Sequence, residues 1–145
     1  MLENTIKEMI TAAKGVLKNS YAPYSNYNVA AAVLMDSGKI YTGVNVENAA
    51  YTSGICAERN ALFSAIAAGE HRALAVAIVA SKDAAKTGVI NEYATPCGHC
   101  RQALREFCNP KEMLVISAIS EDDYRTKTLE ELLPESFGPE NLLNI

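Results

Sequence analysis

The sequence predicts an α/β protein built as a three-layer α/β/α sandwich around a mixed sheet. Two observations carry this prediction. Segments with strand character alternate with segments of helical spacing along the 145 residues. The first two strand segments are joined by a short turn and read as a hairpin, whereas helical segments precede the later strands. Strands separated by helices are typical of a sheet covered by helices on both faces.

Four segments carry the signals of helices. The first has apolar side chains at helical spacing, which is typical of a helix with one buried stripe. The second is apolar on most sides, has Cys56 in its first turn and ends at a glycine, so it predicts a buried helix. The predicted helices cover residues 2–18, 55–68, 98 to 107 or 108, and 128–133.

Four segments carry the signals of strands. The first pair flanks a four-residue turn that contains Asp, Ser and Gly, which favours an antiparallel hairpin. The other two are continuous apolar runs, as expected for strands that are buried on both faces. The predicted strands cover residues 27–35, 40–46, 74–80 and 113–119, and residues 81–95 are expected to form a polar loop.

Composition and charge indicate a single domain, residues 1–145, that acts on a small molecule. The apolar fraction is 49%, which suits a globular core. No apolar run approaches the roughly 18–20 residues that span a bilayer, and the first residues lack a signal-peptide core. We therefore expect a cytoplasmic protein without a membrane partner. The net charge of -4, with no cluster of Lys and Arg, argues against a nucleic-acid partner.

Three cysteines and one glutamate form the pattern with the clearest chemistry. Cys97 and Cys100 are three residues apart, so one short turn can present both to a tetrahedral ion, and Cys56 supplies a third thiolate. Three protein ligands leave a fourth position for water, which is the arrangement of a catalytic zinc. Glu58, two residues after Cys56, is then placed to act as the acid/base beside that water.

The pattern alone leaves other roles open. Cys97 and Cys100 could form a redox pair, as in a thioredoxin-like site. The cysteines could also hold a structural zinc in a non-catalytic binding module, with His99 as the fourth ligand. His99 lies between Cys97 and Cys100, however, so its side chain should point away from their ion. A structural site also has no use for Glu58. Cys108 has no motif around it and reads as a buried thiol.

The motif is in two parts, one with Cys56 and Glu58 and one with Cys97 and Cys100, and it resembles that of the small, homotetrameric, zinc-dependent cytidine deaminases. Three further segments match the same family in the same order. The matching segments are Ala22-Pro23-Tyr24-Ser25, Asn45-Val46-Glu47-Asn48-Ala49, Cys56-Ala57-Glu58-Arg59, Pro96-Cys97-Gly98-His99-Cys100-Arg101-Gln102 and Glu131-Leu132-Leu133-Pro134-Glu135-Ser136-Phe137. The resemblance implies a five-stranded mixed sheet, one Zn²⁺ per chain and a homotetramer.

The resemblance implies a hydrolase that converts cytidine and 2'-deoxycytidine to the uridines and ammonia in pyrimidine salvage. Zinc held by the three cysteines would activate water, and Glu58 would take and return its protons. An alternative on the same scaffold is a blasticidin-type deaminase of a cytosine nucleoside antibiotic, although the segments around Asn45, Glu47 and Phe137 favour the simple nucleoside. An editing role on RNA or DNA is disfavoured by the acidity of the chain.

The resemblance also implies roles outside the metal motif. Asn45 and Glu47 lie two apart, so they face the same side of an extended segment, and they match residues that bind the ribose 3'-hydroxyl. A turn residue and a solvated charge remain open for this pair. Tyr27 stands where the family usually has Phe near the pyrimidine, and Phe137 is expected to reach a neighbouring subunit's pocket. The implied substrate-binding residues are Tyr27, Asn45, Glu47, Ala57 and Phe137.

Arg59 can place a positive charge and a fork of donors against the sulfurs of Cys56 and Cys97. The family's three-cysteine members carry Arg here, although a surface arginine paired with an acid remains open. The sequence departs from the family at two points. Ala30 stands where the family commonly has Gly, and the 81–95 loop is longer than is usual.

Overall fold

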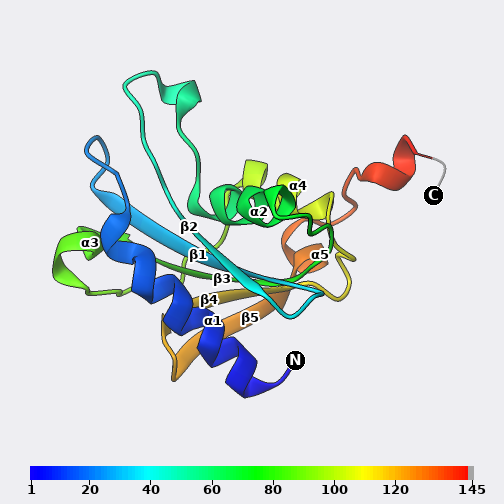
Figure 1. Ribbon diagram of the computed structural model, residues 1–145, viewed down its shortest axis with the longest axis horizontal. Coiled ribbons are helices and arrows are strands. Elements are labelled where there is room, and N and C mark those ends of the chain that lie inside the picture. Colours follow the sequence, from blue (N-terminus) through cyan, green and yellow to red (C-terminus); the bar gives the residue numbers. More distant parts are fainter. Residues whose placement is uncertain (144–145) are drawn as a thin grey trace.

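The computed structural model describes residues 1–143 and contains a mixed five-stranded sheet with the strand order β2-β1-β3-β4-β5 (Figure 1). Strands β3 and β4 are parallel, and the other neighbouring pairs are antiparallel. The strands are β1 (Tyr27–Met35), β2 (Ile40–Val44), β3 (Ala73–Lys82), β4 (Leu114–Ser120) and β5 (Asp123–Thr128). The predicted α/β class and the mixed sheet are therefore confirmed.

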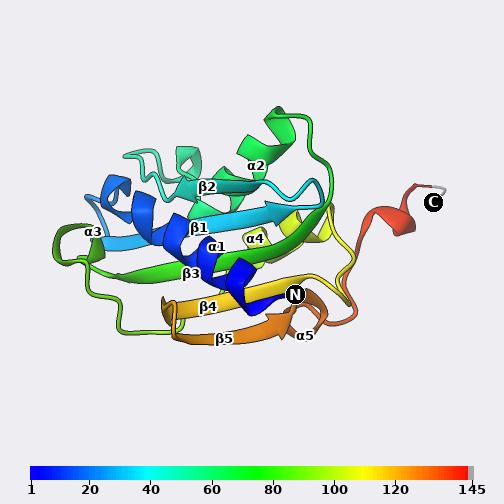
Figure 2. The same ribbon diagram turned by 60° about the horizontal axis from the view of Figure 1, so that its bottom comes forward.

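Helices cover both faces of the sheet, which gives the predicted three layers (Figures 1 and 2). Helix α1 packs on one face, and α2, α4 and α5 pack on the other. The α-helices are α1 (Glu3–Val16), α2 (Ala57–Ala67), α3 (Ala84–Thr87), α4 (Gly98–Arg105) and α5 (Leu129–Leu132), and the 3-10 turns are η1 (Leu17–Asn19), η2 (Tyr51–Ser53) and η3 (Pro139–Asn141). No helix within residues 1–143 combines the length and apolar character needed to cross a membrane.

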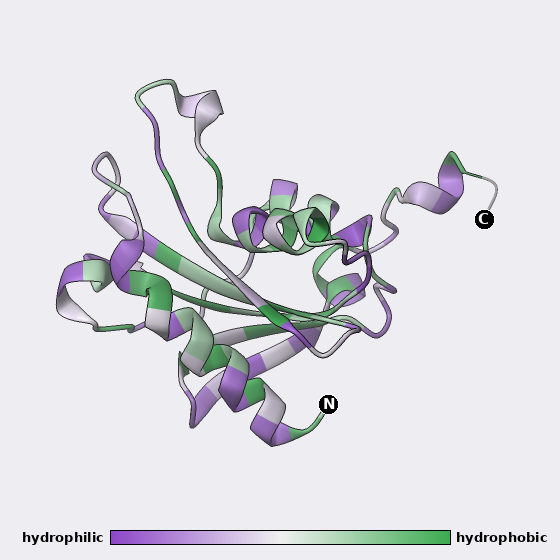
Figure 3. Cartoon of the chain, in the orientation of Figure 1, coloured by the Kyte–Doolittle hydropathy of each residue, from purple (hydrophilic) through white to green (hydrophobic). Residues whose placement is uncertain are grey.

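The apolar residues of strand β1 contribute to the hydrophobic cores on both faces of the sheet. Its even-numbered residues from Ala30 to Leu34 pack under α1, and its odd-numbered residues from Ala31 to Met35 pack under α2. Because neighbouring side chains of a strand point to opposite faces, a strand covered on both sides must be apolar throughout. Figure 3 shows this hydrophobic character along the central strands, and alternating hydrophobic and hydrophilic residues along α1.

Helix α2 lies directly against β2, and Gly43 permits this close approach. A Cβ atom on Gly43 would lie 2.8 Å from the carbonyl oxygen of Ala57 and 2.9 Å from the carbonyl carbon of Asn60. Atoms of the helix backbone cannot move aside as a flexible side chain can. The absence of a side chain at Gly43 therefore sets how close the first turns of α2, which carry Glu58, come to the sheet.

Several predicted bounds differ from the observed ones. The predicted strand 27–35 matches β1, whereas β2 ends at Val44, two residues before the predicted end. The polar loop begins two residues later than predicted, because β3 reaches Lys82, and it contains the short helix α3. The composition did not reveal β5, whose residues are mostly polar and exposed.

Candidate active site

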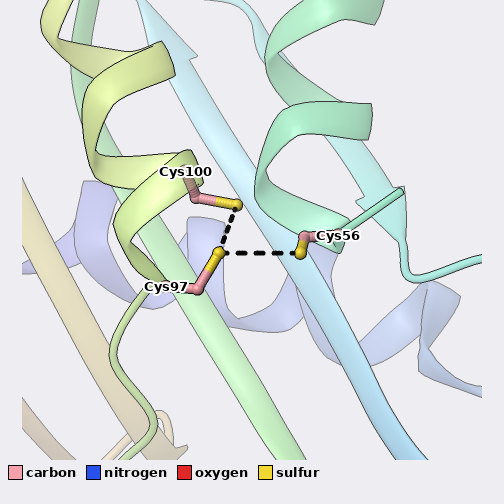
Figure 4. A group of neighbouring side chains, drawn as sticks. All are labelled: Cys56, Cys97 and Cys100. Atoms are coloured by element: carbon pink, nitrogen blue, oxygen red, sulfur yellow. Dashed lines mark hydrogen bonds between the residues drawn. The ribbon is translucent and has the colours of Figure 1, made fainter. Parts of the chain in front are cut away.

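Cys56, Cys97 and Cys100 lie together although they come from two different helices (Figure 4). Cys56 is the residue that precedes α2, Cys97 precedes α4, and Cys100 lies in the first turn of α4. The Sγ atoms of Cys56 and Cys97 are 3.8 Å apart, and those of Cys97 and Cys100 are 3.6 Å apart. Two helix N-termini therefore converge on three sulfur atoms, and each terminus favours negative charge.

This geometry suits a zinc ion. Tetrahedral arms of about 2.3 Å separate neighbouring sulfur ligands by about 3.8 Å, which agrees with the observed spacings. The three sulfur atoms all lie within 4.8 Å of one another. His99 is exposed and does not belong to this cluster, which argues against a closed four-ligand structural site. Cys108 also lies outside the cluster, and burial raises the pKa of its thiol to about 11.

Arg59 lies beside the sulfur cluster, one helical turn after Cys56. Its guanidinium donates to the Cys56 Sγ atom at 3.5 Å, while its buried Nε atom finds no hydrogen-bond partner within residues 1–143. Hydrogen bonds from Cys100 and Arg59 hold the pKa of Cys56 at about 5. A buried N–H donor on a positively charged group can hydrogen-bond to negatively charged sulfur, so the position of Arg59 suits a cluster of thiolates.

Glu58 lies on the same first turn of α2, and only 4% of its surface is exposed. Burial is the main cause, and the nearby Cys56 a smaller one, of a Glu58 pKa that is raised to about 7. A buried carboxyl group with a pKa near neutrality can both accept and return a proton at physiological pH. This combination is typical of a general acid/base at an active site.

A cavity of about 630 Å³ joins these groups to the predicted substrate-binding residues. Its walls include four of the predicted residues and the metal-site residues Cys56, Glu58, Arg59 and Cys97. The four are Tyr27, Asn45, Glu47 and Ala57. Phe137 is not one of the residues that line it within a single chain, and its side chain is 57% exposed.

Asn45 is held by hydrogen bonds to the start of β1, and Glu47 by hydrogen bonds to the loop just before it. The Asn45 amide donates to the Tyr27 carbonyl oxygen at 2.8 Å and accepts from the Val29 amide at 3.0 Å. The Glu47 carboxylate accepts from the backbone N–H groups of Tyr24 and Ser25 at 3.0 and 3.1 Å. These bonds fix both side chains at the cavity wall and leave part of their hydrogen-bonding capacity for a ligand.

Sequence reasoning missed two features of this wall. Tyr24 and Ser25 were matched to the family but given no role, and they hold Glu47. The second feature is Glu92, whose carboxylate accepts a hydrogen bond from the Tyr27 hydroxyl. Glu92 lies in the polar 81–95 loop, outside any motif, so no local signal in the sequence pointed to it.

Comparison with known proteins decides the family. The family model for the cytidine and deoxycytidylate deaminase zinc-binding region matches residues 3–117. The chain belongs to this deaminase family. Curated relatives include the cytidine deaminases of Sporosarcina psychrophila and Halalkalibacterium halodurans, 36% and 39% identical over 137 residues, with 94% of this chain and 94% of each relative covered.

Solved structures of deaminases share the fold. The cytidine deaminase of Burkholderia pseudomallei is 39% identical, with a TM-score of 0.77 over 90% of this chain and 97% of the other. The cytidine deaminase of Mycobacterium tuberculosis is 34% identical, with a TM-score of 0.75 over 90% and 95% of the two chains. This deaminase is therefore a hydrolytic enzyme, and the zinc cofactor predicted from the sequence is confirmed by the family's zinc-binding region and the cysteine cluster.

Proposed function

We propose that this chain hydrolyses cytidine and 2'-deoxycytidine to uridine and 2'-deoxyuridine with release of ammonia, as a cytoplasmic enzyme of pyrimidine salvage. The observation that carries the proposal is the position of Glu58, which is buried at the wall of a cavity beside three clustered thiols. The cytidine deaminases among its relatives support the nucleoside as the substrate. The family match and one continuous sheet also support a single catalytic domain over residues 1–145.

Cys56, Cys97 and Cys100 are proposed to hold the zinc ion as thiolates. When bound, zinc supplies a Lewis acid that makes water nucleophilic near neutral pH. The guanidinium group of Arg59, which lies 3.5 Å from the Cys56 sulfur, would stabilise the negative charge of the Cys56 thiolate.

Glu58 is proposed to carry the protons of the reaction. It would accept one proton from the attacking water and deliver it to ring N3, and then accept the second proton of that water from the new C4 hydroxyl and deliver it to the leaving amine. One water is consumed, the bond from C4 to the exocyclic nitrogen breaks, and a new bond from C4 to oxygen replaces it. The raised pKa of Glu58, about 7, allows the carboxyl group to do both tasks at one pH.

The other cavity residues would bind the nucleoside. We propose that Asn45 and Glu47 hydrogen-bond the ribose 3'-hydroxyl, the Tyr27 ring contacts the pyrimidine, and Ala57 lies beside the base. All four line the cavity that also contains Glu58. The size of this cavity, about 630 Å³, lies within the usual range for small-molecule sites.

We also propose a homotetramer in which Phe137 completes a neighbouring subunit's pocket. The C-terminal segment extends away from the sheet (Figure 1) and leaves Phe137 57% exposed. The base of this segment is nevertheless anchored, because the buried Arg105 binds Ser136 at 2.7 Å and also pairs with Glu140. An anchored segment that exposes large apolar side chains, here Phe137, Leu142 and Leu143, suits a contact with another subunit.

Loss of cytidine absorbance with equimolar release of ammonia tests the proposed function directly. The assay uses the purified zinc-loaded protein with cytidine, 2'-deoxycytidine and no substrate. Turnover of neither nucleoside by a protein with a full equivalent of zinc would refute the proposal. Size measurement of the same preparation by light scattering tests the tetramer separately.

A further inference from the structure

We propose that Glu92 is a positioning residue for the aromatic wall of the pocket, acting through the hydroxyl group of Tyr27. This inference rests on the proposed function, because it assumes that Tyr27 contacts the substrate. The Tyr27 hydroxyl donates to the Glu92 carboxylate across 65 residues of sequence. Glu92 is not among the residues that line the cavity, whereas Tyr27 is. Any effect of Glu92 on a ligand must therefore pass through its partner.

The backbone that carries Glu92 is held in place by its two neighbours in the chain. We call residues 91–93 the strap. Asn91 binds β3, because its backbone N–H donates to the Ser81 hydroxyl at 2.9 Å and its side chain accepts from the same hydroxyl at 2.9 Å. Tyr93 binds β5, because its hydroxyl donates to Asp123 and its ring lies 3.9 Å below the Arg125 guanidinium. The strap would thus stay attached without the Glu92 side chain.

The Tyr27 backbone is fixed independently of Glu92, but its ring is not. The backbone N–H of Tyr27 donates to the Ser25 hydroxyl at 3.0 Å, and its carbonyl accepts from Asn45 at 2.8 Å. The side chain is 36% exposed at the first position of β1, so packing alone leaves the ring freedom to turn. A hydrogen bond to a carboxylate is stronger than one between neutral groups, and here it selects one ring orientation.

The chemistry of the pair favours a lasting hydrogen bond. Burial and the carboxylate of Glu92 both raise the pKa of Tyr27, so the phenol stays protonated and remains a donor. A phenylalanine at position 27 would keep the ring but could not be oriented in this way. The Tyr27 side chain and the 81–95 loop thus meet in one contact. Ordering the ring before the ligand arrives lowers the cost of binding.

Steady-state kinetics of the zinc-loaded enzyme with cytidine test this inference. Glu92→Ala should raise KM by about two- to tenfold, the range expected for one net hydrogen bond, and leave kcat within about twofold. Glu92→Gln keeps an acceptor oxygen and should restore most of the loss. Tyr27→Phe should raise KM similarly, and the double variant with Glu92→Ala should be no worse than Tyr27→Phe alone.

Glu8→Ala serves as the matched control, because Glu8 is an exposed carboxylate on α1, across the sheet from α2. An unchanged KM in Glu92→Ala, or additive effects in the double variant, would overturn the positioning role while the parent enzyme remains active. If the zinc-loaded parent itself does not turn over cytidine, the proposed function fails instead.

Discussion

The guanidinium group of Arg59 lies 3.5 Å from the sulfur of Cys56, one helical turn further along α2. Three thiolates around a divalent cation carry a net charge of about -1, which makes the metal a weaker Lewis acid than a site with neutral imidazole ligands. Arg59 and the N-termini of α2 and α4 are the positive groups that the structure brings to these sulfur atoms. We therefore expect Arg59 to influence the Lewis acidity of the bound metal through this contact.

Replacing Arg59 by Gln should lower turnover while zinc stays bound. Loss of an outer partner of a metal ligand typically costs about 10–100-fold in activity. Arg59→Lys keeps the charge but not the planar fork of donors, so we expect an intermediate rate. Parallel measurement of kcat and zinc content checks this. An unchanged rate in Arg59→Gln would mean that the helix N-termini alone balance the thiolate charge.

Replacing Cys97 or Cys100 by Ala should remove both zinc and activity, because two sulfur ligands seldom hold a stable tetrahedral site. Cys108→Ala is the control, since Cys108 lies outside the cluster and should keep one zinc per chain. Metal analysis of the purified variants decides the result. Full activity of the parent protein with less than half an equivalent of zinc would contradict the assignment.

Glu58→Gln should keep the fold and the zinc but lose the transfer of protons. General acid/base catalysis contributes roughly 10²–10⁴-fold, and we expect the upper end because one carboxyl group serves several transfers. The measurement is kcat for cytidine in protein that has been matched for zinc content. A variant within tenfold of the parent would exclude Glu58 as the proton carrier.

Removal of residues 134–145 should weaken nucleoside binding and leave zinc in place. The removed segment contains Phe137, while the cysteine cluster lies at the N-terminal ends of α2 and α4. We expect a higher KM and a smaller assembly, measured by kinetics and light scattering. A monomer with the activity of the full chain would refute the proposed contribution of a neighbouring subunit.

Gly43→Ala should destabilise the fold, because the added methyl group meets the backbone of α2. Overpacking of this kind typically costs about 1–3 kcal/mol. Gly15→Ala offers a contrast, since the space around Gly15 on α1 is open and alanine favours a helix by roughly 0.5–1 kcal/mol. Chemical denaturation of both variants should therefore show free energies of unfolding that change in opposite directions.

Local patterns predicted those parts of the fold and site that depend on short stretches of sequence. The bounds of β1 match the prediction because every residue from Val29 onward is apolar and buried or partly buried. The position of Glu58 beside Cys56 follows from their spacing on one helical turn. The contact between Tyr27 and Glu92 joins residues 65 positions apart, and no periodicity or motif connects them.

Strand β5 was missed for a different physical reason. Its sequence, Asp123 to Thr128, contains charged residues and threonines rather than an apolar run, and only Tyr124 packs partly against the α1-side core. The strand is held by its antiparallel ladder with β4, which a composition-based reading cannot detect. Here the pairing with β4 determined the strand conformation more than the intrinsic preferences of the β5 residues did.

The same polar composition has a consequence for the behaviour of the chain at high concentration. Strand β5 forms one of the two outer edges of the sheet, and its free side presents backbone groups without a neighbouring strand, which a second chain could extend into a fibril. Arg125 and Lys127 are exposed on this strand. Their charges repel an identical strand brought alongside in register, so the edge that is least visible in the sequence also resists aggregation.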